Sequence, residues 1–231
     1  MTGVQTCALP ILSEQGNGTS NEYKDGGGLY NGQAGNGNGR AVPGRVDGVV
    51  GYGQDFWPAT SGKPATTSAI SLPETLDPGN SAWTFQVWVK RMGYEDMTLF
   101  NKGDDWVAGN QRFEIFINGA NGGRLGVMRE GAETYTNVYI PAQTYVHLGI
   151  VYTGAHYDIY MDGWLRESHD WTQGGAPRGD CVLGAYYSDG TQGFQGSLDE
   201  VWIHSKNRSP MWMRMTFENQ KAGSTLVSLR R

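Results

Sequence analysis

The chain has no uninterrupted apolar run of about 18 residues, the length that a membrane-crossing helix needs. Charge is also scarce: charged residues make up 18% of the 231 positions, and the formal net charge is −5. The 18 lysines and arginines stand singly or in pairs, so no basic face is available for nucleic acid. The sequence therefore predicts no membrane span within this stretch and no nucleic-acid partner.

Residues that carry common catalytic chemistry are few. Cys7 and Cys181 cannot build a disulfide framework, and Cys181, in an apolar stretch, is expected to be a small core side chain. The four histidines form no zinc-binding pattern, and a Gly-x-Ser-x-Gly motif is missing. Asp199 and Glu200 are adjacent in an expected strand, so we expect them to point to opposite faces and not to act as a glycosidase pair. The sequence predicts no enzyme.

Glycine is abundant, with 35 residues, and 12% of the chain is aromatic. This composition favours many short strands joined by tight turns. Residues 83–90 (Trp-Thr-Phe-Gln-Val-Trp-Val-Lys) alternate, which indicates a strand with one core face, and Asp162-Gly163 suits a two-residue hairpin turn. These signals predict about ten to twelve strands and one short helix near residues 210–220. An all-β, two-sheet antiparallel jelly-roll sandwich with one short C-terminal helix accommodates them.

The first twelve residues, Met-Thr-Gly-Val-Gln-Thr-Cys-Ala-Leu-Pro-Ile-Leu, lack the basic start and long apolar centre of a signal peptide. They resemble the translation of a sequencing-adapter oligonucleotide fused to a gene fragment. We therefore expect residues 1–12 to be an artefactual leader and residues 13–231 to form a single domain with its core over 46–220. Residues 13–48 are rich in Gly and Asn, which leaves open either a solvated loop or a metal-holding loop.

The stretch 196–204, Gly-Ser-Leu-Asp-Glu-Val-Trp-Ile-His, holds the most informative carboxylate. Simple alternation puts Asp199 on the side of Val201 and Ile203, which we expect to face the core. A carboxylate beside an apolar layer is costly unless a cation or several N–H donors compensate it. Ser209-Pro210 then suits the N-cap and first position of the short helix.

The stretch 196–204 resembles the closing strand of laminin-G-like, or concanavalin A-like, jelly-roll domains, commonly Gly-x-Ile/Leu-Asp-Glu-Val-x-Ile-Tyr. Residues 83–90 are similar to their Phe-Thr-Ile-Ser-Ala-Trp-Val-Lys strand, 97–103 to Leu-Phe-Ser-Lys-Gly, and 145–154 to Trp-x-His-Val-Ala-x-Val-Tyr-Asp-Gly, with Tyr in place of the first Trp. The resemblance covers roughly residues 46–220. It implies a non-catalytic recognition module of a larger bacterial exported or envelope protein, located outside the cell or in its envelope.

The resemblance also implies one structural Ca²⁺. Such domains often open with an Asp-x-x-Gly-x-x-Asn-Gly loop, which Asp25, Gly28, Asn31 and Gly32 match. First and last strands of a jelly roll commonly lie side by side, so we expect Asp25 and Asn31 to reach Asp199 and supply oxygen ligands. The alternative is that Asp199 accepts two or three backbone N–H bonds from a neighbouring loop.

Aromatic residues in expected loops or on the non-core face are the candidate ligand-binding residues. They are Trp106, Trp164, Trp171, Trp202, Tyr186 and Tyr187. Such rings stack on sugars or peptides, or else pack half-buried under long loops. A glycan or a surface protein is the expected partner. A passive structural spacer is the alternative, and a glycoside hydrolase of the same superfamily is disfavoured because no Glu-x-Asp-x-x-Glu pattern occurs.

Overall fold

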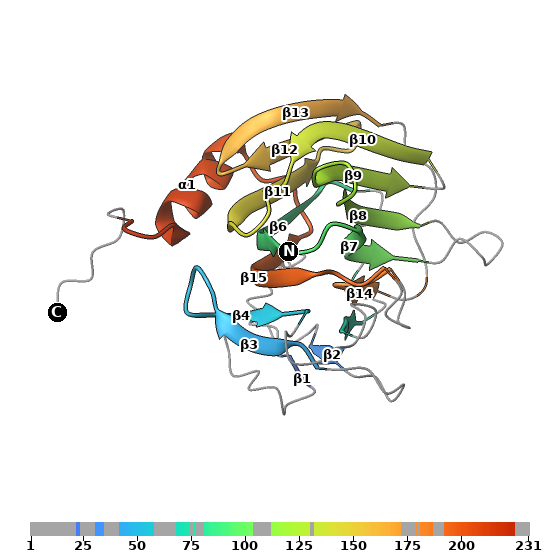
Figure 1. The fold of residues 1–231 in the computed structure, drawn as a ribbon. Coiled ribbons are helices and arrows are strands. Elements are labelled where there is room, and N and C mark those ends of the chain that lie inside the picture. Colours follow the sequence, from blue (N-terminus) through green and yellow to red (C-terminus); the bar gives the residue numbers. More distant parts are fainter. Residues whose placement is uncertain are drawn as a thin grey trace.

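The computed structural model describes residues 22–23, 31–34, 42–57, 68–73, 76, 81–103, 112–129, 132–171, 179, 181–186 and 192–224. These residues form two antiparallel sheets, of eight and seven strands, and one helix, α1 (Pro210–Gln220) (Figure 1). The expected all-β jelly-roll sandwich with a short C-terminal helix is confirmed. The described helix is too short and too polar to cross a membrane.

The two sheets mix strands from distant parts of the chain. The order of the eight-stranded sheet is β1 (Glu22–Tyr23), β2 (Gly32–Ala34), β5 (Ile70–Leu72), β14 (Cys181–Leu183), β7 (Asp96–Lys102), β8 (Phe113–Asn118), β9 (Arg124–Arg129) and β10 (Ala132–Tyr139). The order of the seven-stranded sheet is β13 (Trp164–Asp170), β12 (His156–Met161), β11 (Val146–Tyr152), β6 (Trp83–Arg91), β15 (Gly196–His204), β4 (Tyr52–Asp55) and β3 (Gly44–Asp47). The late strand β15 therefore lies between β6 and the early strand β4.

The core fills the space between the sheets. The alternating side chains of β6 that the sequence assigned to the core, Trp83, Phe85, Val87 and Val89, are all buried there. Trp83 from one sheet meets Phe113 from the other edge to face, with ring centroids 4.9 Å apart. Such cross-sheet aromatic contacts add to the burial of apolar surface that stabilises the sandwich. Cys181 is buried in β14, as expected for a small core side chain.

A β-bulge interrupts β15. Asp199 pairs with Trp88 and Trp202 pairs with Gln86, so three steps along β15 match two steps along β6. Glu200 is the extra residue, and its φ of 49° lies in the left-handed region that non-glycine residues seldom adopt. The bulge shifts every later side chain of β15 by one position relative to simple alternation.

The bulge decides which side chains of β15 enter the core. Leu198, Val201 and Ile203 are buried in the core cluster. Asp199 and Glu200 both lie on the outer face, where Asp199 is opposite Trp88 and Glu200 contacts α1. The predictions that Asp199 shares the side of Val201 and Ile203, and that Asp199 and Glu200 point to opposite faces, are therefore wrong. The physical reason is the extra residue, which breaks the two-residue period.

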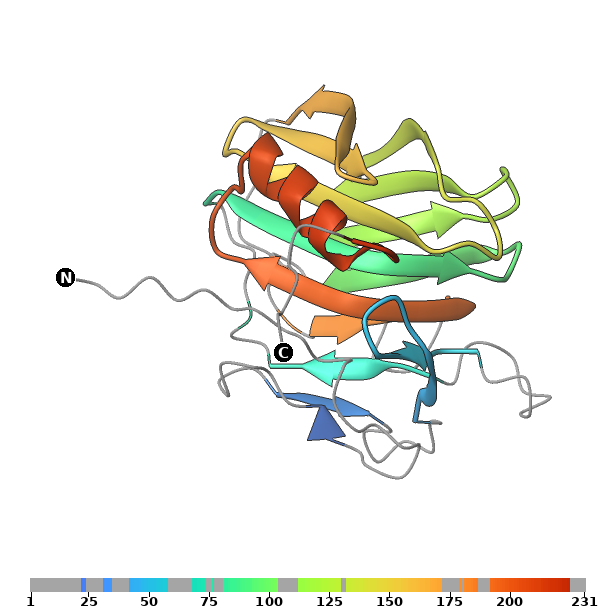
Figure 2. The same ribbon diagram turned by 90° about the vertical axis from the view of Figure 1, so that its left-hand side faces the viewer.

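Helix α1 begins as the sequence predicted. Ser209 caps it, with its hydroxyl oxygen accepting a hydrogen bond from the Trp212 backbone N–H at 3.2 Å, and Pro210 is its first residue. Figure 2 shows α1 lying across the outer face of the seven-stranded sheet. Met213 is fully buried at that contact, and it lies so close to Gly149 of β11 that a Cβ there would be 2.0 Å from its terminal methyl carbon. The helix therefore covers one region of the sheet and leaves β15 partly open beside it.

Candidate functional site

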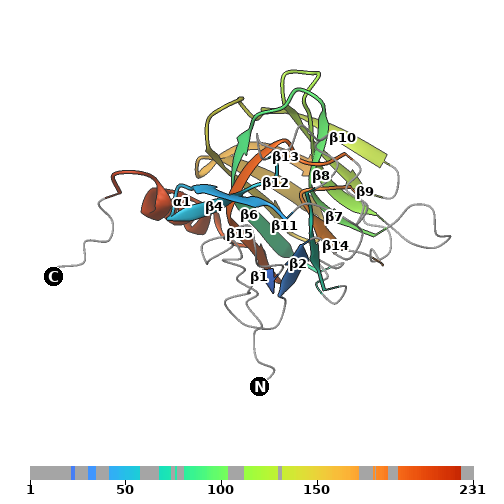
Figure 3. The same cartoon turned by 60° about the horizontal axis from the view of Figure 1, so that its bottom comes forward.

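A cleft of about 750 Å³ lies on the outer face of the seven-stranded sheet, between α1, β15 and the β3–β4 turn (residues 48–51). Figure 3 shows this turn, in blue, beside α1. The lining residues are Val49, Val50, Glu200, Trp202, Trp212, Met215, Thr216, Asn219 and Gln220. Three segments that are distant in the sequence thus form one concave surface with apolar walls and a few polar groups, which is typical of small-molecule sites.

Helix α1 forms one wall of the cleft. Trp212, Met215, Thr216 and Asn219 are spaced by three, one and three residues, so they share one face of α1. Trp212 and Met215 are exposed there, with 38% and 58% of their surface accessible. Sequence reasoning considered this segment only as a helix, although the spacing of its apolar residues was the available signal.

Trp202 forms the opposite wall, on β15. The ring of His204 lies between the two tryptophans, with centroid distances of 5.6 Å to Trp202 and 6.1 Å to Trp212. Gln86 contacts the Nε2 of His204 at 3.2 Å, and burial lowers the pKa of His204 to about 4. A buried neutral imidazole therefore contacts both indole walls.

Glu200 supplies the carboxylate of the cleft. Its Oε2 accepts hydrogen bonds from Trp202 Nε1 at 3.1 Å and from Gln220 Nε2 at 2.9 Å. Gln220 is itself held by Trp88, whose Nε1 donates to Gln220 Oε1 at 2.8 Å. Burial raises the pKa of Glu200, and the nearby charge of Asp199 raises it further, while the Trp202 hydrogen bond opposes the rise. The side chain is thus a held hydrogen-bond acceptor at the base of the cleft.

Asp199 is fully buried behind the β3–β4 turn. Its Oδ2 accepts hydrogen bonds from the backbone N–H groups of Val49 at 2.7 Å and Val50 at 2.9 Å. A Cβ at Gly48 would lie 2.4 Å from the same oxygen, so this close approach requires glycine. Burial raises the pKa of Asp199, and the two N–H groups oppose that rise. The alternative to calcium, in which backbone N–H groups of a neighbouring loop compensate Asp199, is therefore present in the structure.

The expected calcium ligands are not seen as a cluster. Asp25 lies outside the described residues, and Asn31 directly precedes β2 in the sheet that does not contain Asp199. Among the residues that the structure describes, no three His, Cys, Asp or Glu side chains form a group able to hold a metal ion. Calcium binding by Asp25, Asn31 and Asp199 stays a prediction.

The structure describes four of the six predicted aromatic residues, and these four lie apart. Trp202 lines the cleft, Trp164 is 58% exposed under the guanidinium of Arg214, and Trp171 packs partly buried against the core. Tyr186 lines a different hollow, while Trp106 and Tyr187 lie outside the described ranges. The described members form no common platform, and the second wall of the cleft, Trp212, was not among the candidates.

The hollow at Tyr186 has about 250 Å³ and lies over β7, β8 and β9. Two of its charged groups pair with each other: Glu114 forms an ion pair with Arg112 at 3.3 Å, and it accepts a hydrogen bond from Thr98 Oγ1 at 2.5 Å. The guanidinium of Arg112 also lies 4.4 Å from the centre of the Tyr186 ring. Because these buried partners already pair, the hollow offers less to a ligand than the cleft beside α1.

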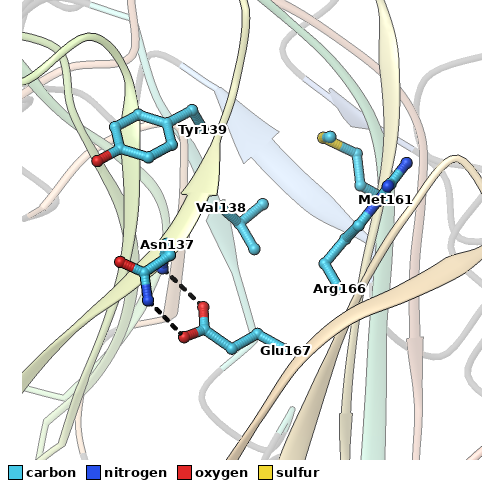
Figure 4. Close-up of a pocket in the computed structure, with 6 residues that line it drawn as sticks. All are labelled: Asn137, Val138, Tyr139, Met161, Arg166 and Glu167. Atoms are coloured by element: carbon cyan, nitrogen blue, oxygen red, sulfur yellow. Dashed lines mark hydrogen bonds between the residues drawn. The ribbon is translucent and has the colours of Figure 1, made fainter.

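A third cavity, of about 470 Å³, lies where the edge strands of the two sheets meet (Figure 4). Glu167 of β13 accepts hydrogen bonds from the Asn137 backbone N–H at 2.6 Å and from its Nδ2 at 3.0 Å. Figure 4 shows these two bonds, with Tyr139 and Arg166 on either side of the opening. Both carboxylate oxygens of Glu167 accept hydrogen bonds from Asn137. We therefore interpret this contact as a link between the two sheets and not as a ligand site.

Comparison with protein families shows that residues 64–213 match the model of the concanavalin A-like lectin/glucanases superfamily, of laminin G type. No curated protein matches the chain in sequence.

Solved structures share the fold at low sequence identity. Domain 4 of AbnA, a GH43 extracellular arabinanase from Geobacillus stearothermophilus in complex with arabinotriose, is 18% identical with a TM-score of 0.66, covering 91% of this chain and 98% of that one. The binding domain of Paraclostridial Mosquitocidal Protein 1 is 16% identical with a TM-score of 0.64, and the receptor binding domain of botulinum neurotoxin D is 12% identical with a TM-score of 0.58. The matches to these two cover 92% and 90% of this chain and 52% of each of theirs. At such identities the likeness concerns the fold alone.

Proposed function

The chain belongs to the concanavalin A-like lectin/glucanases superfamily, and on that premise we propose that it is a non-catalytic module that binds carbohydrate in the cleft beside α1. The observation that carries the proposal is the pairing of two tryptophan walls, Trp202 and Trp212, with the held acceptor Glu200. Indole rings offer flat apolar faces to the C–H side of a sugar ring. A carboxylate accepts hydrogen bonds from the sugar hydroxyls, and an amide group can both accept hydrogen bonds from them and donate to them.

The carboxylates of the cleft favour binding over hydrolysis. A glycosidase needs two carboxyl groups on either side of the scissile bond, roughly 5–9 Å apart. Glu200 lines the cleft, but Asp199 is fully buried and its Oδ2 is engaged by the backbone N–H groups of Val49 and Val50. One accessible carboxylate can orient a sugar, but it cannot supply both the acid and the base or nucleophile.

The structural neighbours support this class of function. One is a domain of an extracellular arabinanase in complex with arabinotriose, and others are binding domains of toxins. We extend the proposal to an extracellular or cell-envelope location, as one module of a larger chain. A surface protein as the partner and a passive spacer role are the competing functions.

Glycan-array binding followed by calorimetry tests the proposal, with arabinotriose as the first oligosaccharide. Trp202→Ala and Trp212→Ala are expected to weaken binding at least about tenfold, equivalent to about 1.4 kcal/mol. Trp164→Ala is the matched control, because Trp164 is exposed but does not line the cleft. An array with no binder at about millimolar concentration would favour the spacer role, and release of shortened oligosaccharides would establish a hydrolase instead.

A further inference from the structure

The charge of the cleft comes from one residue. Among the described residues that line it, Glu200 alone is ionisable, and the others are apolar, hydroxyl or amide side chains. Only 7% of Glu200 is accessible, so its carboxylate has few waters to screen it. Two charges in such a site interact much more strongly than they would in bulk water.

Glu200 is held in a fixed position. The bulge places it on the outer face with φ 49°, and Trp202 and Gln220 donate to its Oε2. Its Oε1 receives no hydrogen bond that the described part of the chain supplies. A ligand hydroxyl that donates a hydrogen bond would complete the carboxylate. The carboxylate or sulfate group of an anionic ligand has no proton to give, and it would face a like charge.

Neighbouring charges strengthen this preference. Asp199 lies one residue away on the same face and adds a second buried carboxylate. The guanidinium of Arg208 is one positive group near the cleft, but it stacks on the Trp212 ring at 4.2 Å and contacts His204 Nδ1 at 3.0 Å. Arg208 does not line the cleft, so it leaves the charge at the ligand side to Glu200.

We propose that Glu200 determines specificity, so that the cleft binds neutral sugars, whose hydroxyl groups donate to Glu200 Oε1, and rejects glycans that carry a carboxylate or sulfate. This inference rests on the proposed carbohydrate-binding function. It predicts the chemical class of ligand, which neither the fold nor the tryptophan walls alone decide.

The test compares pairs of oligosaccharides that share a sugar type and differ in carrying a carboxylate or a sulfate, such as galactotriose with trigalacturonic acid and lactose with its 3′-sulfated form. The protein is expected to bind the neutral member of a pair at least about tenfold more tightly. In Glu200→Gln that preference is expected to shrink to less than about threefold, because the amide presents a donor in place of the charge. Asn219→Asp, on the exposed rim of the cleft, is expected to widen the preference instead.

The outcomes separate the two proposals. Equal binding of both members, or tighter binding of the acidic one, would overturn the selectivity while leaving carbohydrate binding intact. Failure of every neutral and acidic sugar to bind would overturn both. If thermal melts show that Glu200→Gln does not fold, the wild-type comparison and Asn219→Asp still test whether the cleft prefers neutral sugars. An unchanged preference in Asn219→Asp would contradict binding beside α1.

Discussion

Asp199 and Val49 are joined across 150 positions of the sequence by a 2.7 Å hydrogen bond from the Val49 N–H to Asp199 Oδ2. The same oxygen accepts the N–H of Val50. This contact fastens the β3–β4 turn to β15 and so places one wall of the cleft. The same two hydrogen bonds therefore position the β3–β4 turn and compensate the buried carboxylate of Asp199.

Asp199→Ala is expected to destabilise the fold by about 2–4 kcal/mol, because it leaves two partly buried N–H groups without their acceptor. Asp199→Asn keeps one acceptor oxygen and is expected to cost less. Urea denaturation measures both, with the exposed Asp170→Ala at the end of β13 as the control, expected within about 0.5 kcal/mol of wild type. Equal stabilities of Asp199→Ala and Asp170→Ala would show that the contact contributes little.

The calcium hypothesis makes a separate prediction. An ion held by Asp25, Asn31 and Asp199 would raise the thermal midpoint of unfolding. At a hundredfold excess of calcium over its dissociation constant, the added free energy of unfolding would be about 2.7 kcal/mol. The rise would disappear in Asp199→Asn. Thermal melts with and without a chelator measure the effect. An unchanged wild-type midpoint would remove the hypothesis and leave the Val49 and Val50 N–H groups as the compensation for Asp199.

Trp171 and Trp164 are expected to respond differently to substitution by alanine. The Trp171 ring contacts Phe113, Tyr152 and Tyr157, with centroids 5.0–6.1 Å away, so its loss is expected to cost about 2–4 kcal/mol. Trp164 is exposed on β13, and its loss is expected to cost less than about 1 kcal/mol, mainly its contact with Arg214. Chemical denaturation distinguishes them, and similar values for both variants would contradict the packing of Trp171.

His147 makes stability depend on pH. It is buried between Trp88 and Phe217, with ring centroids 5.3 Å and 6.2 Å away, and burial lowers its pKa to about 4. The unfolded chain, with a pKa of about 6.5, takes up the proton first, so stability is lost as the pH falls from about 6.5 to about 4. This single group accounts for a loss of up to about 3 kcal/mol.

Unfolding of wild type and His147→Gln across this pH window measures the effect. The variant is expected to lose less stability on acidification. His204, whose pKa is also lowered to about 4, adds to the loss in both proteins, whereas the raised pKa values of Asp199 and Glu200 act in the opposite direction in both. Because only His147 differs, parallel stability curves would contradict its role.

Removal of residues 1–12 is expected to change the free energy of unfolding by less than about 1 kcal/mol. The reason is that this segment resembles adapter-derived sequence, which was never selected together with the fold. Denaturation of a chain that starts at Ser13 measures it. A larger loss would show that the leader packs on the domain.

Local features of the fold followed from the sequence. Alternation in 83–90 predicted the core face of β6, and Ser209-Pro210 predicted the start of α1. Asp162 and Gly163 adopt positive φ values of 55° and 76°, as their turn requires. Each depends on backbone preferences or periodicity within a few residues, so the amino-acid order alone carries the information.

The candidate site depended on the tertiary structure. Simple alternation placed Asp199 on the wrong side because the bulge at Glu200 exists only in the pairing of β15 with β6, which no local pattern of β15 specifies. The walls of the cleft come from residues 49–50, 200–202 and 212–220. The spacing of apolar residues in α1 indicates that Trp212 and Met215 share a helix face. It does not say what that face meets, because this depends on where α1 lies on the sheet. The sequence by itself thus determined the core face of β6, the turn and the start of the helix, while long-range packing decided which side chains meet at the cleft.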